Sequence, residues 1–202
     1  MTHHPLMLVT AFEPYDGSPI NPAEQVLKQL PDIINGVSLR KIALACDSVR
    51  TPPRVTDLAS DPLVNIVVIM GEDRRYAVPT LERIAYNWLQ YDVPDNLGLK
   101  PVGTSIVSHG PVSLETPIDV AAIHLALTRI GTLINISDDP GRHLCNHVYY
   151  TVRYHTDPKP VLLLHLPRLP EQQKHSSMEL ADSLQVTFDV LMLLSYLIEE
   201  HQ

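Results

Sequence analysis

The sequence predicts a single three-layer α/β domain, and three observations support this class. Short, almost uninterrupted aliphatic runs recur along the chain, as in strands that are buried on both faces of a sheet. Segments with apolar residues at three- and four-residue steps lie between these runs, as in helices with one buried face. The composition does not shift and no internal repeat appears along the 202 residues, so we expect one domain over residues 1–202.

The strands are expected where aliphatic residues form short runs bounded by turn residues. These runs cover residues 6–11, 37–45, 65–70, 134–136 and 161–166. The run at 65–70 is the clearest, and Gly71 is expected to end it. Residues 104–108 form a shorter β-like piece, whereas the apolar spacing of residues 80–87 is ambiguous.

The helices are expected where apolar residues recur at helical spacing. The first begins at Pro22, because proline suits the first turn and Asn21 can cap it. Others are predicted after residue 53, over residues 118–129 and over residues 177–200. The turn-rich loop at residues 12–21 follows a strand end, which is where α/β proteins bind ligands.

Composition disfavours several classes of protein. The net charge of −8 is spread along the chain without a lysine- or arginine-rich block, so we expect no nucleic-acid partner. No apolar run reaches membrane-spanning length and no leader pattern opens the chain, so we expect no membrane association and a cytoplasmic location. The two cysteines lack the spacing of a disulfide framework or a zinc knuckle, and we expect no cofactor and no metal.

The segment at residues 134–150 is the strongest candidate for a catalytic site. A β-branched run breaks at residues 138–141 (Asp-Asp-Pro-Gly), and the pattern after it is compatible with a helix. Cys145 is therefore expected near a helix start, where backbone amides and the dipole stabilise a thiolate. A cysteine nucleophile also needs a base and a group that orients this base. His165 and Glu82 stand at strand or loop ends, which converge on one crevice in open α/β sheets.

Each candidate has a simpler interpretation beside the catalytic one. Cys46 is expected to be a small buried apolar residue. His165 lies on an aliphatic strand and could be a hydrogen-bonded core histidine. Glu82 could form a surface charge pair with the adjacent Arg83.

A zinc site is a further alternative for the cysteine segment. His143, Cys145 and His147 have the spacing of a metal cluster on a strand. On a helix, however, Cys145 would point away from both histidines. The helical pattern therefore disfavours this alternative.

Four motifs, in order and over nearly the whole chain, resemble those of the pyroglutamyl peptidase I family, also called pyrrolidone-carboxylate peptidases (cysteine peptidase family C15). Residues 11–17 with Asn21-Pro22 resemble the opening loop of the family, and residues 80–87 match its glutamate signature. The cysteine signature is matched by Ser137, Gly141, Cys145 and Asn146. Residues 165–172 resemble the histidine segment.

The resemblance implies a fold and a reaction. The fold is a mixed, twisted sheet between helices, which makes the expected class a three-layer α/β/α domain. The reaction is the removal of an N-terminal pyroglutamyl residue from a peptide. Cys145 would be the nucleophile, His165 the general base and then acid, and Glu82 the group that orients the imidazole.

The resemblance also implies a substrate pocket and partners. Two aromatic rings of the opening loop sandwich the lactam in the family, which here indicates Phe12 and Tyr15. Asn21 and Glu72 complete the substrate-binding candidates. The expected partner is a peptide with a blocked N-terminus, and since the family is commonly oligomeric, a homo-oligomer is a further expectation.

One loop departs from the family pattern. Where the family usually has GQAGGR, residues 71–76 read Gly-Glu-Asp-Arg-Arg-Tyr. Arg74 and Arg75 replace two glycines, and Tyr76 stands at the position of the arginine. His143 stands where the family has an aromatic residue. These differences predict a divergent substrate pocket beside an intact Cys-His-Glu set.

The sequence therefore predicts a cysteine peptidase of the pyroglutamyl peptidase type. Two alternatives stay open. One is an amidase for another small N-acyl group. The other is a catalytically silent family member that binds blocked peptide termini or acts as an interaction protein.

Overall fold

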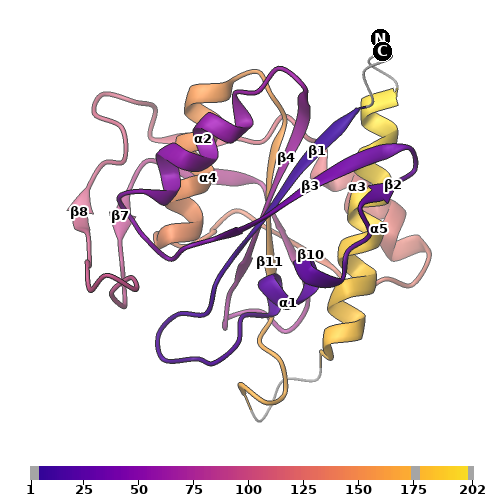
Figure 1. Ribbon diagram of the computed structural model, residues 1–202, viewed down its shortest axis with the longest axis horizontal. Coiled ribbons are helices and arrows are strands. Elements are labelled where there is room, and N and C mark those ends of the chain that lie inside the picture. The colour runs from indigo at the N-terminus through magenta and orange to yellow at the C-terminus, as the bar shows by residue number, and fades with distance from the viewer. Residues whose placement is uncertain (1–4, 174–177, 200–202) are drawn as a thin grey trace.

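The computed structural model describes residues 5–173 and 178–199. Its central element is a seven-stranded sheet. Across the sheet the strands are β10 (Asn135–Ser137), β5 (Thr80–Glu82), β11 (Val161–Leu166), β4 (Val64–Glu72), β1 (Leu6–Phe12), β3 (Val37–Leu44) and β2 (Ile33–Ile34). β5 and β11 are antiparallel, as are β2 and β3, whereas the other neighbours are parallel. The sheet is thus mixed, and its strands cross one another in projection as twisted strands do (Figure 1).

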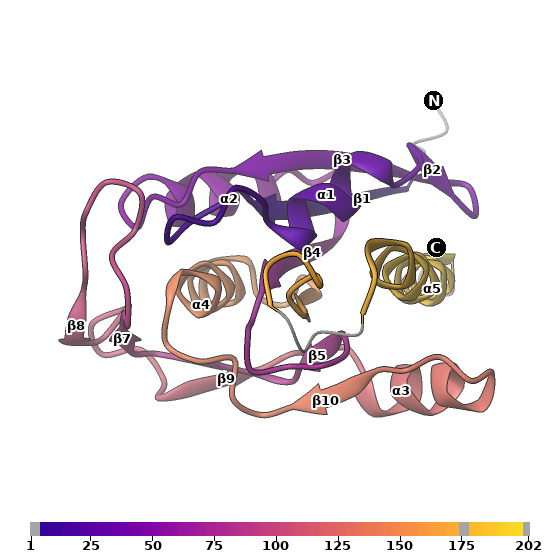
Figure 2. The same ribbon diagram turned by 90° about the horizontal axis from the view of Figure 1, so that it is seen from below.

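Helices cover both faces of the sheet. Alternate residues of β1 enter two different cores: Met7 and Val9 face one, and Leu8 and Phe12 face the other. The first core is closed by α1 (Pro22–Gln29), α3 (Val120–Arg129) and α5 (Leu180–Glu199). The second is closed by α2 (Thr51–Ala59) and α4 (Leu144–Thr156). Figure 2 shows α4 and α5 on opposite sides of β4. The predicted three-layer α/β/α class is confirmed.

Two small antiparallel sheets lie outside the central one. One pairs β6 (Ile84–Tyr86) with β9 (Ser113–Glu115), and the other pairs β7 (Leu89–Gln90) with β8 (Val102–Thr104). The ambiguous segment at residues 80–87 is therefore extended, with β5 in the main sheet and β6 beside it. The β-like piece expected at 104–108 is limited to the end of β8.

Several strands and helices begin or end at residues other than those predicted, and one of these differences, at Gly71, concerns the site. The cap of α1 is confirmed, because Asn21 Oδ1 accepts a hydrogen bond from the Ala23 amide at 3.0 Å. Gly71 was expected to end its strand, and this is wrong: β4 continues through Gly71 to Glu72. A glycine at this point serves close packing rather than strand termination.

The terminal helix α5 is long and apolar enough to cross a membrane by length and composition alone. Its residues Val190, Leu191 and Leu194 are fully buried in the first core. Its apolar face therefore packs against the fold. Residues 177 and 200 of the predicted helix lie outside the described residues.

Candidate active site

Cys145 lies in the first turn of α4. The loop before it turns sharply, with Gly141 at a φ of +73°, a conformation that favours glycine. The N-cap residue His143 makes no side-chain hydrogen bond to the first turn among the described residues. The amides of this turn are thus available for a negative charge next to the sulfur.

The backbone of β4 presses closely against the cysteine. A Cβ atom built on Gly71 would lie 2.5 Å from Cys145 Sγ and 3.3 Å from His165 Cδ2. Any side chain at this position would displace the thiol or the imidazole. Gly71 also lies opposite His165 in the parallel pairing of β4 and β11, so the two strands set the thiol beside the imidazole.

His165 and Glu82 form a buried pair. His165 Nδ1 lies 2.8 Å from Glu82 Oε1, and the two residues are 1% and 0% exposed. They come from β11 and β5, which are antiparallel neighbours. Burial by itself lowers the pKa of His165, but the Cys145 and Glu82 side chains outweigh it and raise this pKa to about 10. The pair thus favours an imidazolium next to the sulfur. Arg83 points elsewhere and pairs with Asp138 at 2.7 Å, so the surface pair with Glu82 is wrong.

Tyr76 adds a second contact to the buried carboxylate. Its hydroxyl lies 2.9 Å from Glu82 Oε1 and 2.9 Å from Ser137 Oγ. Arg75 lies in the same loop, but it donates to the Asp73 carboxylate at 2.6 Å and to the Asp139 carbonyl at 3.0 Å instead. The tyrosine, and not either arginine, is therefore the residue of this loop that contacts Glu82.

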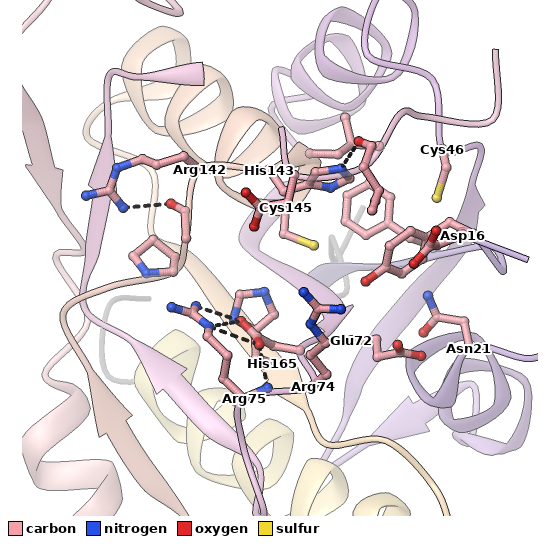
Figure 3. Close-up of a pocket in the computed structure, with 18 of the residues that line it drawn as sticks. Asp16, Asn21, Cys46, Glu72, Arg74, Arg75, Arg142, His143, Cys145 and His165 are labelled. Carbon is pink, nitrogen blue, oxygen red and sulfur yellow. Dashed lines mark hydrogen bonds and ion pairs between the residues drawn. The ribbon is translucent and has the colours of Figure 1, made fainter. Parts of the chain in front are cut away.

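The thiol opens into a cavity of about 200 Å³. All four predicted substrate-binding residues line it together with Cys145 and His165: Phe12, Tyr15, Asn21 and Glu72. Figure 3 shows the Cys145 sulfur directed into this cavity, with Glu72 and Asn21 across from it. The sequence-based set is thus gathered in one place, although its members contribute differently.

Phe12 and Tyr15 supply the aromatic part of the wall. Phe12 is the last residue of β1 and is only 2% exposed, so its ring also belongs to the second core. Burial and the nearby Glu72 carboxylate raise the pKa of Tyr15 above its usual value, so its phenol stays neutral. Together the two rings provide a neutral surface.

Glu72 and Asn21 are largely occupied by the protein itself. Glu72 Oε1 accepts from Arg168 Nε at 2.7 Å, and Oε2 accepts from Gln172 Nε2 at 2.7 Å. Asn21 caps α1 and donates to the Glu13 carbonyl at 3.2 Å. Arg168 and Gln172 lie in the 165–172 segment, but sequence reasoning gave neither a role. An arginine close behind the strand histidine was the available signal for a buried ion pair.

Cys46 also lines the cavity but differs from Cys145. It is 5% exposed, and burial raises the pKa of its thiol above the usual value. Its Sγ lies 3.4 Å from the Glu13 carbonyl. It is a protonated, buried cysteine, as the sequence predicts.

The histidines beside Cys145 do not form a metal cluster with it. His143 Nε2 lies 3.0 Å from the Val93 carbonyl, and His147 Nδ1 lies 3.1 Å from the Tyr91 hydroxyl. Within residues 5–173 and 178–199, no three His, Cys, Asp or Glu side chains are grouped to hold a metal ion.

An α/β sheet that brings a cysteine, a buried His-Glu pair and helix amides to one cavity defines a cysteine hydrolase. A family model described as pyroglutamyl peptidase matches residues 6–194. The chain therefore belongs to the pyroglutamyl peptidase family.

Relatives and solved structures agree with this assignment. The chain is 31% identical to a pyrrolidone-carboxylate peptidase of Yersinia pestis over 172 residues, which cover 82% of this chain and 80% of the relative. It is similar to the pyrrolidone carboxyl peptidase of Thermus thermophilus with a TM-score of 0.87 and 29% identity, over 92% of this chain and 98% of that one. The Thermococcus litoralis enzyme gives 0.89 and 26%, over 97% and 96%.

Proposed function

We propose that the protein hydrolyses the amide bond that follows an N-terminal pyroglutamyl (5-oxoprolyl) residue of a peptide. The observation that carries this proposal is the Cys145 sulfur at the mouth of a small cavity walled by Phe12 and Tyr15 and backed by His165 and Glu82. A neutral aromatic wall suits a flat, uncharged lactam. The names of the relatives supply the same substrate.

In the first half of the reaction, Cys145 is the nucleophile. Its thiolate attacks the carbonyl carbon of the amide bond that joins the pyroglutamyl residue to the peptide, and the oxygen of this carbonyl becomes an oxyanion. The free amides of the first turn of α4 stabilise this charge, an effect worth about 3 kcal/mol per donor. His165, held by Glu82, gives its proton to the leaving amine as the C–N bond breaks, which leaves a pyroglutamyl thioester on Cys145.

In the second half, water replaces the peptide. Neutral His165 takes a proton from the water, the resulting hydroxide attacks the thioester, and the C–S bond breaks. Free pyroglutamate leaves, and the thiolate and imidazolium are restored. Glu82 keeps the imidazole in one tautomer through both halves, with its proton on Nδ1 whenever the ring is neutral.

Phe12 and Tyr15 are proposed to hold the lactam ring between them. Asn21 and Glu72 act as wall residues: Asn21 fixes the start of α1, and Glu72 ties β4 to Arg168. A peptide with a blocked N-terminus is the proposed partner. The cytoplasmic location and the homo-oligomer stay predictions from the sequence.

Hydrolysis of a pyroglutamyl-coumarin amide by the wild-type protein and by Cys145→Ala tests the proposal. We expect release of coumarin by the wild type and a loss of at least about 10⁴-fold in kcat/KM for the variant. Absence of activity in the wild type, or equal activity in both proteins, would refute it.

An amidase for another small N-acyl group is the second candidate. The Glu72 carboxylate and the Arg168 guanidinium in the cavity wall favour it, because charged groups there suit a charged or more polar acyl group, such as prolyl, better than a neutral lactam. A panel of N-acetyl, N-formyl and N-prolyl coumarin amides separates the two. A higher kcat/KM for any of these than for the pyroglutamyl substrate would favour the second candidate.

A further inference from the structure

Tyr76 and His165 share one oxygen atom of Glu82. The Tyr76 hydroxyl lies 2.9 Å from Oε1, and His165 Nδ1 lies 2.8 Å from the same atom. The other carboxylate oxygen, Oε2, is buried and has no hydrogen-bond partner among the described residues. In the described part of the chain, the Glu82 carboxylate is therefore hydrogen-bonded by these two groups alone.

The direction of these hydrogen bonds follows from the chemistry of the groups. An ionised carboxylate and a carbonyl can only accept, and a phenol has a single proton. Glu82 Oε1 lies nearer at 2.9 Å and carries charge, whereas the Asp139 carbonyl lies at 3.3 Å, so Tyr76 donates to Glu82. The Ser137 hydroxyl, 2.9 Å away, then donates to the Tyr76 oxygen. Ser137 Oγ in turn accepts from the Asp139 amide at 2.9 Å. A continuous chain thus joins the loop before Cys145 to the base.

Tyr76 is well suited to remain a donor. Burial and the adjacent Glu82 carboxylate hold the pKa of Tyr76 above its usual value, although its hydrogen bond to Ser137 acts in the opposite direction. The phenol stays protonated throughout the range in which a cysteine peptidase works. The other ionisable groups that face the His165 and Glu82 pair are Cys145 and Tyr149 from α4 and Asp73 from the loop after β4.

We propose that Tyr76 is a positioning residue that fixes the Glu82 carboxylate and, by donating to the oxygen shared with His165, weakens the hold of Glu82 on the imidazole proton. This inference rests on the proposed function for its catalytic consequence, but the hydrogen-bond chain exists without a substrate.

The consequence has a definite sign. A donor that withdraws charge from Oε1 makes Glu82 a weaker partner for the imidazolium. Without the Tyr76 hydroxyl, the carboxylate holds the imidazolium more tightly. His165 then gives up its proton at a higher pH and transfers it less readily to the leaving amine.

The variant Tyr76→Phe tests this directly. The ¹³Cε1 resonance of His165, assigned with His165→Gln, is titrated in the wild type and in the variant, and kcat and KM are measured against pH. We expect the His165 titration and the alkaline limb of kcat/KM to move upward by about half a pH unit or more, with kcat lower by about 10-fold and KM within about twofold. Tyr150→Phe is the matched control. Tyr150 lies in α4, and its hydroxyl donates to the Pro111 carbonyl at 2.7 Å rather than to Glu82.

The outcomes separate this proposal from the proposed function. An upward His165 shift without hydrolysis of the pyroglutamyl substrate by either protein would support the role of Tyr76 and refute the proposed function. An unchanged or downward titration would overturn the role of Tyr76, whatever the activity. If Tyr76→Phe does not fold, Ser137→Ala gives the same test, because it removes the donor to Tyr76 and should give a smaller shift in the same direction.

Discussion

The two walls of the cavity are built in different ways. The inner wall is built on regular elements: the start of α4 brings Cys145 and β11 brings His165, and behind them lie Gly71 of β4 and Glu82 of β5. Glu82 and His165 are almost fully buried there. The outer wall is made by loops with charged side chains, and Arg74 and Arg75 are exposed.

This difference separates the residues proposed to catalyse the reaction from those that influence which substrate binds. Strand pairing and close packing hold the groups of the inner wall in one arrangement, as catalysis requires. Ion pairs of the outer wall are partly hydrated, so they tolerate changes of residue at low energetic cost. We therefore expect substitutions on the inner wall to change kcat, and substitutions on the outer wall to change mainly KM and substrate preference.

Gly71→Ala should have the largest effect. Its Cβ would lie 2.5 Å from Cys145 Sγ, so the sulfur has to move away from the imidazole. We expect kcat to fall by about 100-fold or more. Overpacking should lower the free energy of unfolding by about 1–3 kcal/mol. Steady-state kinetics and urea unfolding measure the two effects.

A double-mutant cycle is the control for Gly71→Ala. In a Cys145→Ala background the clashing sulfur is absent, so adding the methyl group at position 71 should cost less stability than in the wild type. Equal costs in both backgrounds would mean that the thiol is not the atom that Gly71 accommodates.

Glu82→Gln should have the next largest effect. The amide keeps the size of the side chain but removes one of the two groups that raise the pKa of His165, so this pKa should fall, although Cys145 still raises it. We expect kcat to fall by about 100-fold and the alkaline limb of kcat/KM to move to lower pH. This direction is opposite to that expected for Tyr76→Phe. An alkaline limb at its wild-type position would contradict the assignment of that limb to His165.

Arg75→Ala should have the smallest effect. The Arg75 side chain is 44% exposed and pairs with Asp73 and Asp139. Such pairs are worth about 0–1 kcal/mol, so we expect kcat to stay within about twofold while KM changes. Arg75→Lys keeps the charge and is the matched control. A kcat lower by more than about 10-fold in Arg75→Ala would place the outer wall in the chemistry and remove the distinction between the walls.

The sequence indicated the candidates through local patterns. The capping residue Asn21, the strand β1 buried on both faces and the helix start at Cys145 are set by neighbours along the chain, and these predictions are confirmed by the structure. The four motifs that resemble those of the family indicated the candidate catalytic and binding residues as a set. Their roles stay proposals that the variants above can test.

Other features depend on residues that are distant in the sequence. Glu82 and His165 are 83 positions apart, and Tyr76 and Ser137 are 61 apart. No local pattern reveals which hydroxyl reaches which carboxylate. The same holds for Gly71, for which the sequence pattern predicted the end of a strand. A glycine that ends a strand and a glycine that leaves room for a neighbouring sulfur cannot be distinguished from the sequence alone.

The sequence by itself thus determined the fold class, most elements and the residues able to carry a cysteine peptidase reaction, because periodicity, capping and turn chemistry act between near neighbours. Only the tertiary structure decided that Gly71 accommodates the thiol, that Glu72 is tied to Arg168 and that Tyr76 shares the carboxylate of Glu82 with His165. The physical reason is that strand pairing and the packing of α4 on the sheet set the distances between these groups.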